Sequence, residues 1–240
     1  MRLEARKLSV LRGGHVAVDR VSFTVAGAGW TGLVGANGSG KTSLLRALAG
    51  RLEAAGGAIL IDGVDVTGDR ACRAAAIGFA PDAAALPDSL SGRELFAILD
   101  GEAVGLDPDD PLHPLRRALA FDAFFDRRIG TLSQGMRQRL AIFTAFLARP
   151  RIVLLDEPFN WLDPISAFDT RAALDALVAA EGLILVTALH DMASLVRHCG
   201  AGLLLADGRI SHRLGAGEID AGRRDFAGFE ARMIAELRGR

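Results

Sequence analysis

The segment from Gly35 to Thr42 has the residue types and spacing needed to bind phosphate groups. It reads Gly-Ala-Asn-Gly-Ser-Gly-Lys-Thr, which fits the pattern GxxxxGK[ST], and it lies between an apolar run and a run with helical character. Glycines let backbone N–H groups turn inward around phosphate oxygens, and the N-terminus of the following helix adds a favourable dipole. The segment therefore predicts a nucleotide-phosphate site. Its residues are Gly35, Ala36, Asn37, Gly38, Ser39, Gly40, Lys41, Thr42 and Ser43.

Lys41 and Thr42 carry the reactive side chains of this loop. Lys41 is expected to reach the β- and γ-phosphate oxygens and to take part in catalysis, and Thr42 to ligate Mg²⁺. The chain contains only one other lysine, Lys7, and all its remaining Lys/Arg positions are arginines. A compact ammonium fits into a phosphate-binding nest of backbone N–H groups that a planar guanidinium would crowd. We therefore expect this position to require lysine. The alternative is a glycine turn that happens to precede a helix.

Two carboxylates follow a second apolar run. Residues 152–155 read Ile-Val-Leu-Leu and lead directly into Asp156 and Glu157. Ligands of open α/β sheets collect at the carboxyl ends of strands, so both acids are expected at that edge. Asp156 is then placed to hold Mg²⁺, and Glu157 to act as the catalytic group that polarises the attacking water. Alone, such a segment is more often an ordinary acidic turn; together with the phosphate loop it predicts nucleotide hydrolysis.

The elements that must position these residues alternate between strands and helices. Short apolar runs recur between helix-like stretches, and several are continuous, as expected for strands buried on both faces of a largely parallel sheet. This pattern indicates an α/β fold. Residues 82–150 lack such runs and are predicted to form an inserted helical lobe. Its helix-like segments cover residues 92–99, 112–121 and 135–148.

The last part of the chain has a helical pattern of its own. After residue 225, large apolar residues recur at helical spacing and predict a helix with one apolar stripe. The stripe consists of Phe226, Phe229, Met233 and Leu237. We expect it to pack on the protein's own core, and a partner-docking surface is the alternative.

The composition argues against several classes of function. The 240 residues, half of them apolar, suffice for one sizeable domain. The 28 basic and 29 acidic residues are intermixed, so there is no basic stripe for nucleic acid. Cys72 and Cys199 stand far apart and outside any CxxC or Cys/His cluster, which argues against a disulfide framework or a zinc site and favours a cytoplasmic setting. No apolar run approaches the ~18 residues of a membrane span, so we expect contact with a membrane only through a partner.

Further motifs resemble those of ABC-type ATPases, in that family's order. Residues 132–136, Leu-Ser-Gln-Gly-Met, precede the acidic strand as the family's signature motif does. Ser133 can cap the following helix, whose N-terminus with the Gly135 amide can meet a γ-phosphate bound by another subunit. Asp163 matches the aspartate of the family's D-loop, and His190, after a core strand, resembles the switch histidine. The alternatives are a plain serine-capped helix and an incidental histidine.

The resemblance covers nearly the whole chain and implies an ATP-binding cassette. Its fold would be an α/β P-loop NTPase with a largely parallel core sheet, N-terminal antiparallel β strands and an inserted α-helical lobe. Within one domain, residues 1–81 and 151–215 would form the catalytic core, 82–150 the helical lobe and 216–240 a C-terminal helical tail. The resemblance implies ATP and Mg²⁺ as ligands, and a homodimer or a heterodimer with a second ABC ATPase, with Asp163 at the dimer seam.

The resemblance also implies a transmembrane permease as partner. The chain would then be cytoplasmic and peripheral at the inner face of the cell membrane, and ATP hydrolysis would power transport. Met136 followed by Arg-Gln-Arg-Leu, together with the short C-terminal tail, resembles export-type (ABC-2) systems, so export is the predicted direction. Two alternatives are a soluble ABC ATPase of complex assembly, such as iron–sulfur assembly, and a module that binds nucleotide and regulates without hydrolysing it.

Several positions depart from the family's pattern. Asp82 stands where the family has a glutamine that reaches the metal and faces the permease, although a carboxylate also binds Mg²⁺. Arg12 stands near the usual adenine-stacking aromatic, and its guanidinium plane can stack on the base. Four further substitutions make the predicted dimer seam bulkier: Gln134, Met136, Phe159 and Trp161. Hydrolysis is still expected, because the phosphate loop and its acidic partners are complete.

Overall fold

The apolar runs form two β-sheets. A computed structural model of the chain describes residues 1–99 and 103–238. The larger sheet has the order β10-β9-β3-β8-β7-β6. Its strands are β3 Gly29–Val34, β6 Ile77–Phe79, β7 Ile152–Asp156, β8 Ile184–Leu189, β9 Ala201–Ala206 and β10 Arg209–Leu214. Neighbouring strands are parallel except β9 and β10, so the predicted largely parallel core sheet is confirmed.

The smaller sheet is antiparallel and begins with the N-terminal strands. Its order is β2-β1-β4-β5. The strands are β1 Arg2–Arg12, β2 His15–Ala26, β4 Gly56–Ile61 and β5 Val64–Asp65. Gly13 and Gly14 connect β1 to β2 with φ of 58° and 80°, a backbone conformation that glycine adopts without a Cβ penalty. The predicted N-terminal antiparallel strands are confirmed.

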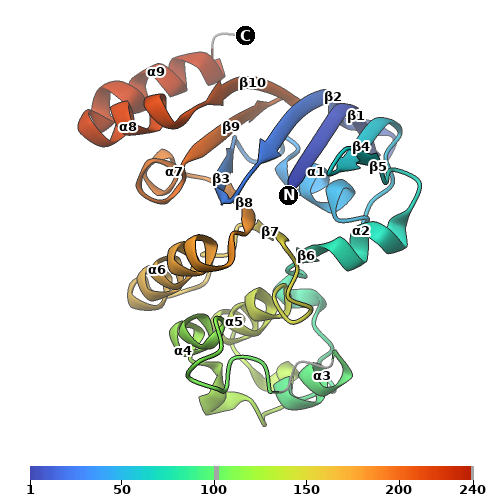
Figure 1. Cartoon of the computed structure of the whole chain (residues 1–240), viewed down its shortest axis with the longest axis vertical. Coiled ribbons are helices and arrows are strands. Elements are labelled where there is room, and N and C mark those ends of the chain that lie inside the picture. Colours follow the sequence, from blue (N-terminus) through green and yellow to red (C-terminus); the bar gives the residue numbers. More distant parts are fainter. Residues whose placement is uncertain (100–102, 239–240) are drawn as a thin grey trace.

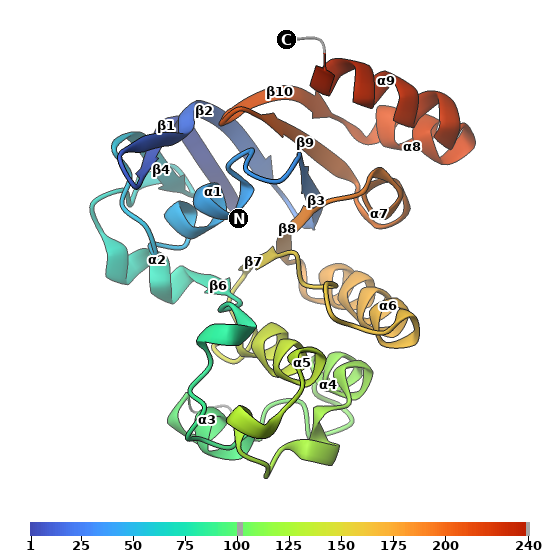
Figure 2. The same ribbon diagram turned by 180° about the vertical axis from the view of Figure 1, so that it is seen from behind.

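Helix α1 (Lys41–Leu48) lies between the two sheets. Its leucines pack in one apolar cluster with the buried residues of β1 and with Ile152 and Leu154 of β7. Val153 and Leu155 point the other way and join a second cluster formed largely by helices. Because successive strand residues face opposite sides, the continuous apolar run of β7 serves both layers. Figure 2 shows α1 next to β1 and β4, with α6 and α7 beyond β8.

Between β6 and β7, the regular elements of the described residues are helices. They are α3 Gly92–Ile98, α4 His113–Leu119, α5 Gln134–Thr144 and the 3-10 turns Ala83–Ala85, Phe121–Phe124 and Ile129–Thr131, whereas α2 Arg70–Ala76 lies just before β6. Figure 1 shows α3, α4 and α5 gathered at the opposite end of the molecule from β1 and β2. The three predicted helices are present, but α5 ends at Thr144, because the Phe146 N–H bonds to the Phe143 carbonyl in a tighter turn. Residues 100–102 of the predicted lobe lie outside the described residues.

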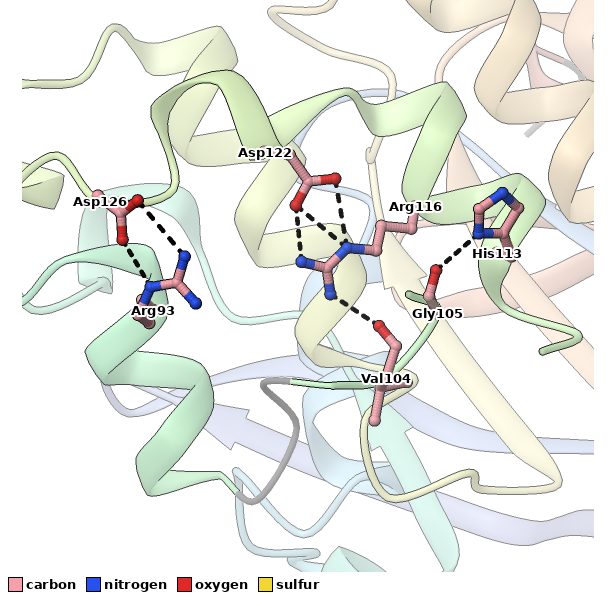
Figure 3. A network of polar contacts seen from close by, with 7 residues as sticks. All are labelled: Arg93, Val104, Gly105, His113, Arg116, Asp122 and Asp126. Carbon is pink, nitrogen blue, oxygen red and sulfur yellow. Dashed lines mark hydrogen bonds and ion pairs between the residues drawn. The ribbon is translucent and has the colours of Figure 1, made fainter. Parts of the chain in front are cut away.

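A buried arginine organises these helices. Arg116 on α4 is 3% exposed, and its guanidinium carbon lies 5.0 Å and 5.2 Å from the ring centroids of Phe121 and Phe125. Its Nη2 donates to Asp122 Oδ1 at 2.6 Å, and its Nη1 donates to the Val104 carbonyl at 2.8 Å (Figure 3). The charge is therefore removed from water but retains an ion pair, a carbonyl acceptor and aromatic faces.

We expect Arg116→Met to lower the free energy of unfolding by about 2 kcal/mol, because charge-assisted hydrogen bonds and cation–π contacts are lost. Arg93→Met is the control for burial. Arg93 also has its guanidinium carbon 5.1 Å from the Phe125 ring centroid and donates to Asp126 at 2.6 Å (Figure 3), but the side chains of this ion pair are both well exposed. Such a pair contributes roughly 0–1 kcal/mol. Urea unfolding measures both variants, and equal losses would contradict the special role of Arg116.

The remaining helices cover the second half of the core sheet. They are α6 Pro164–Glu181, α7 Met192–His198, α8 Ala216–Arg224 and α9 Phe226–Arg238. Phe229 and Met233 of α9 are buried in the main apolar cluster, and Leu237 packs against it, so the predicted packing on the protein's own core is confirmed for these three residues. For Phe226 it is wrong, because this side chain at the start of α9 is exposed. Residues 239–240 of the predicted tail lie outside the described residues. Within the described ranges, no helix is both long enough and apolar enough to span a membrane.

Candidate nucleotide site

Three core strands end at one edge of the parallel sheet, and a predicted site segment follows each of them. The phosphate loop follows β3, the carboxylate of Glu157, which is predicted to be catalytic, follows β7, and the predicted switch histidine follows β8. Val34 of β3 lies opposite Leu189 of β8, and Asp156 of β7 lies opposite Ala188. The Glu157 N–H also donates to the Ala188 carbonyl at 3.2 Å. The parallel register therefore brings together segments that are far apart in the sequence.

The glycines of the phosphate loop are required by the backbone. Gly38 and Gly40 have φ of 82° and 106°, in the left-handed region that side chains disfavour. A Cβ on Gly35 would lie 2.2 Å from the Leu205 carbonyl oxygen, and one on Gly40 would lie 2.3 Å from the Ala17 carbonyl oxygen. The loop therefore packs tightly against β9 and β2, and α1 begins directly behind it.

Lys41 places its ammonium inside this loop. The side chain is 4% exposed, and Nζ donates to the Gly35 carbonyl at 2.7 Å and the Ala36 carbonyl at 3.2 Å. It also lies 3.7 Å from Glu157 Oε1. A cation is thus held in the loop, where phosphate oxygens can replace these acceptors. Ser43, one residue beyond Thr42, is buried in the first turn of α1.

A cavity of about 210 Å³ adjoins the loop, and Thr42, Asp82, Asp156 and Glu157 lie along its wall. Burial raises the pKa of the Asp156 carboxyl, a hydrogen bond from the Thr42 hydroxyl opposes the rise, and the Glu157 charge adds to it. Among the described residues, no donor reaches the buried Oδ1 of Asp156. An unpartnered carboxylate oxygen beside a hydroxyl and other carboxylates is an oxygen-only donor set, which fits Mg²⁺.

Glu157 leaves β7 in an unusual conformation, with φ of 46°. Its carboxylate lies at the cavity, where Oε2 accepts a hydrogen bond from Asn160 Nδ2 at 2.7 Å and Oε1 faces Lys41. The side chain is 28% exposed, so it is accessible from the cavity. This geometry agrees with the water-polarising role predicted for Glu157.

The signature segment packs against the loop that follows the acidic strand. Ser133 caps α5 as predicted, because its Oγ accepts a hydrogen bond from the Met136 N–H at 3.3 Å. A Cβ on Gly135 would lie 2.5 Å from the Trp161 carbonyl oxygen, so only glycine fits there. The Trp161 side chain itself is 65% exposed. The N-terminus of α5 is therefore held close to the predicted dimer seam.

Asp163 is bound within its own chain as the N-cap of α6. It accepts hydrogen bonds from the Ile165 and Ser166 N–H groups and, at 2.6 Å, from the Ser166 hydroxyl. Arg139 on α5 also pairs with it at 2.9 Å. The Ser166 hydroxyl bond is the main cause that lowers the pKa of Asp163 to about 2. A role for Asp163 at a dimer seam remains a prediction.

This low pKa predicts a pH-dependent contribution to stability. The folded-state pKa lies below the ordinary value of 3.8, so the stabilisation is complete above about pH 4 and is lost as the pH falls towards 2. We therefore expect the difference in Tm between the wild type and Asp163→Asn to shrink over this range. Thermal unfolding at several pH values measures it, and a difference that is constant with pH would contradict the prediction.

Of three other predicted residues, only Asp82 lines the cavity. Asp82 is on its wall, but its Oδ1 accepts a hydrogen bond from the Ala84 N–H at 3.0 Å. His190 is exposed at the end of β8, with Nε2 4.0 Å from Asp191 Oδ2. Arg12 is exposed on the β1–β2 hairpin and is not among the residues that line the cavity. Their roles in metal, phosphate and adenine binding stay predictions.

The cavity also contains residues that sequence reasoning missed: Arg46, Gln138 and Asn160. Arg46 follows Thr42 by one helical turn, so the spacing of α1 could have revealed it. Asn160 follows Glu157 by three residues, which is the reach of a turn. Gln138 comes from α5, and no local pattern connects it to β7.

The fold and the site together define an α/β P-loop ATPase. A family model described as ABC transporter matches residues 18–160. The hemin import ATP-binding protein HmuV of Bordetella pertussis is 33% identical over 229 residues, which cover 88% of this chain and 85% of that protein. The chain belongs to the ABC transporter family as an ATP-binding cassette, an ABC ATPase.

Other relatives agree with this assignment. The taurine import ATP-binding protein TauB of Pseudomonas putida is 37% identical over 212 residues, which cover 84% of this chain and 76% of that protein. A solved ATP-binding subunit of an ABC transporter has a TM-score of 0.80 at 26% identity and covers 99% of both chains. A dimeric cassette bound to ADP and Pi shares the fold, with a TM-score of 0.74 at 21% identity, covering 89% of this chain and 98% of that one. The predicted cassette fold and ATP binding are confirmed.

Proposed function

We propose that this chain hydrolyses Mg-ATP to power a membrane permease, as one member of a nucleotide-sandwich dimer. The observation that carries the proposal is the sheet edge, where the ammonium of Lys41 lies 3.7 Å from the carboxylate of Glu157 beside one cavity. The relatives support the coupling to transport, because their names describe import ATP-binding proteins. We also propose the domain limits predicted above, with residues 82–150 as the helical lobe.

The residues divide the work of hydrolysis. The phosphate loop and Lys41 bind the β- and γ-phosphates, and Glu157 accepts a hydrogen bond from the attacking water and polarises it. Thr42, Asp156 and Asp82 would hold Mg²⁺, which when bound supplies positive charge next to the phosphates. His190 would contact the γ-phosphate from the end of β8.

The dimer supplies the other half of each site. Ser133 and Gly135 of one subunit would meet the γ-phosphate bound by the second, with Asp163 at the seam. The second subunit is another copy of this chain or a homologous ABC ATPase. The permease would dock beside Asp82 and the helical lobe and hold the chain at the cytoplasmic face of the membrane.

The direction of transport is a separate question. Residues 136–140 of the signature helix, together with the short C-terminal tail, favour export, which stays a prediction. The names of the relatives favour import, because hemin, taurine, phosphonate and molybdenum proteins among them are all described as import ATP-binding proteins. Substrate uptake into right-side-out and inverted vesicles that contain the complex would decide between the two directions.

The decisive experiment measures ATPase activity of the chain alone and together with a candidate permease, a protein with several spans of ~20 apolar residues. Co-purification and stimulated hydrolysis are the expected results. ATP hydrolysis that no candidate permease stimulates, in a chain that co-purifies with none of them, would favour the soluble assembly ATPase instead. Nucleotide binding without hydrolysis, alone or in the complex, would favour a regulatory module.

A further inference from the structure

The two carboxylate oxygens of Glu157 have different surroundings. Oε2 accepts a hydrogen bond from Asn160 Nδ2 at 2.7 Å, whereas Oε1 lies 3.7 Å from Lys41 Nζ. An ionised carboxylate only accepts hydrogen bonds, so the Asn160 amide must present its NH₂ group to it. Oε2 is thus held within the turn, and Oε1 faces the Lys41 ammonium, which is proposed to bind the phosphates.

Two hydrogen bonds to backbone carbonyls hold the turn that contains Asn160. The Asn160 N–H donates to the Glu157 carbonyl at 3.2 Å, and Gln138 Nε2 on α5 donates to the Pro158 carbonyl at 3.2 Å. Gln138 is 8% exposed, so this second bond is shielded from water. The amide of Asn160 is therefore presented to Glu157 by a fixed backbone and not by a free loop.

We propose that Asn160 is a positioning residue for ATP hydrolysis, which orients the Glu157 carboxylate. By holding Oε2, it leaves Oε1 to accept the hydrogen bond from the attacking water. Without it, the Glu157 side chain rotates freely and can form a closer ion pair with Lys41, which competes with the phosphates for that ammonium. This role deepens the function proposed above and rests on it.

Steady-state kinetics of Asn160→Ala and Asn160→Asp test the proposal. For Asn160→Ala we expect kcat to fall about tenfold and KM for ATP to change less than about twofold, because a hydrogen bond to a charged group is lost but the phosphate loop is intact. Asn160→Asp should have the lower kcat of the two, because its carboxylate repels that of Glu157. A purely structural role in the turn predicts the opposite order, because aspartate has the shape and turn preference of asparagine.

The Glu157→Gln background supplies an independent readout. There, Asn160→Ala should change the residual rate less than about twofold, because no charged carboxylate remains to be oriented. Ser211→Ala is the control: its hydroxyl bonds to the Leu204 carbonyl on β9, at a distance from the cavity, and kcat should not change. An unchanged kcat in Asn160→Ala, a full tenfold loss in the Glu157→Gln background, or Asn160→Asp as active as wild type would each overturn the proposal. If the wild type itself fails to hydrolyse ATP, the proposed function is wrong, whatever Asn160 does.

Discussion

Glu157→Gln is expected to lower ATP turnover by about 100- to 10,000-fold, the range typical of a lost general base. Glutamine has nearly the same shape and can still receive the Asn160 hydrogen bond through its carbonyl oxygen. It cannot polarise water as a carboxylate does. ATP binding should persist, because the phosphate loop and Lys41 are unchanged, so the ATP-bound dimer should accumulate.

Phosphate release and size-exclusion chromatography with ATP measure these two effects. Glu181→Gln is the matched control, because Glu181 is exposed at the end of α6, outside the cavity. Turnover that stays at the wild-type level in Glu157→Gln would show that another group activates the water. A loss of turnover without an ATP-bound dimer would refute the proposed nucleotide sandwich.

Lys41→Ala is expected to weaken ATP binding and to slow ATP hydrolysis. The ammonium is the only lysine side chain in the loop, and its carbonyl acceptors are Gly35 and Ala36. Losing it should reduce turnover by about 100- to 1,000-fold, the effect typical of removing one preorganised hydrogen-bond donor that stabilises charge in the transition state. ATP affinity should fall as well, which distinguishes this variant from Glu157→Gln.

Fluorescent-nucleotide titration and phosphate release measure the Lys41→Ala effect. Lys7→Ala is a well-matched control, because Lys7 is the only other lysine and its side chain is exposed on β1. It removes the same charge from the surface and should leave affinity and turnover unchanged. Equal losses in the two variants would mean that net charge, and not the phosphate loop, controls binding.

The phosphate loop and the acidic strand were predictable because each is local. The left-handed backbone of one turn needs the glycines at 38 and 40, and the predicted roles of Lys41 and Thr42 follow from their place at the start of α1. The apolar run before Asp156 predicted a buried strand, and the register of β7 with β8 then placed its end at the ligand-binding edge. The order of the motifs predicted the cassette.

The environment of the Glu157 carboxylate was not predictable in the same way. Asn160 lies close to Glu157 in sequence, but only the left-handed φ of Glu157 turns the amide towards the carboxylate. Gln138 donates to the Pro158 carbonyl from α5, which is far from this turn in the sequence. The capping of α6 by Asp163 likewise involves Arg139 of α5, which no spacing indicates.

The sequence by itself thus predicted the groups of the site and their order: a phosphate loop, a carboxylate proposed to bind Mg²⁺ and a glutamate proposed to be catalytic, on an α/β sheet. Periodicity and motif spacing act over a few residues, so they specify elements and the groups at their ends. Only the tertiary structure decided which side chains surround the cavity and how the Glu157 carboxylate is oriented. Those contacts join α1, α5 and β7, and they depend on packing between elements that the chain order does not reveal.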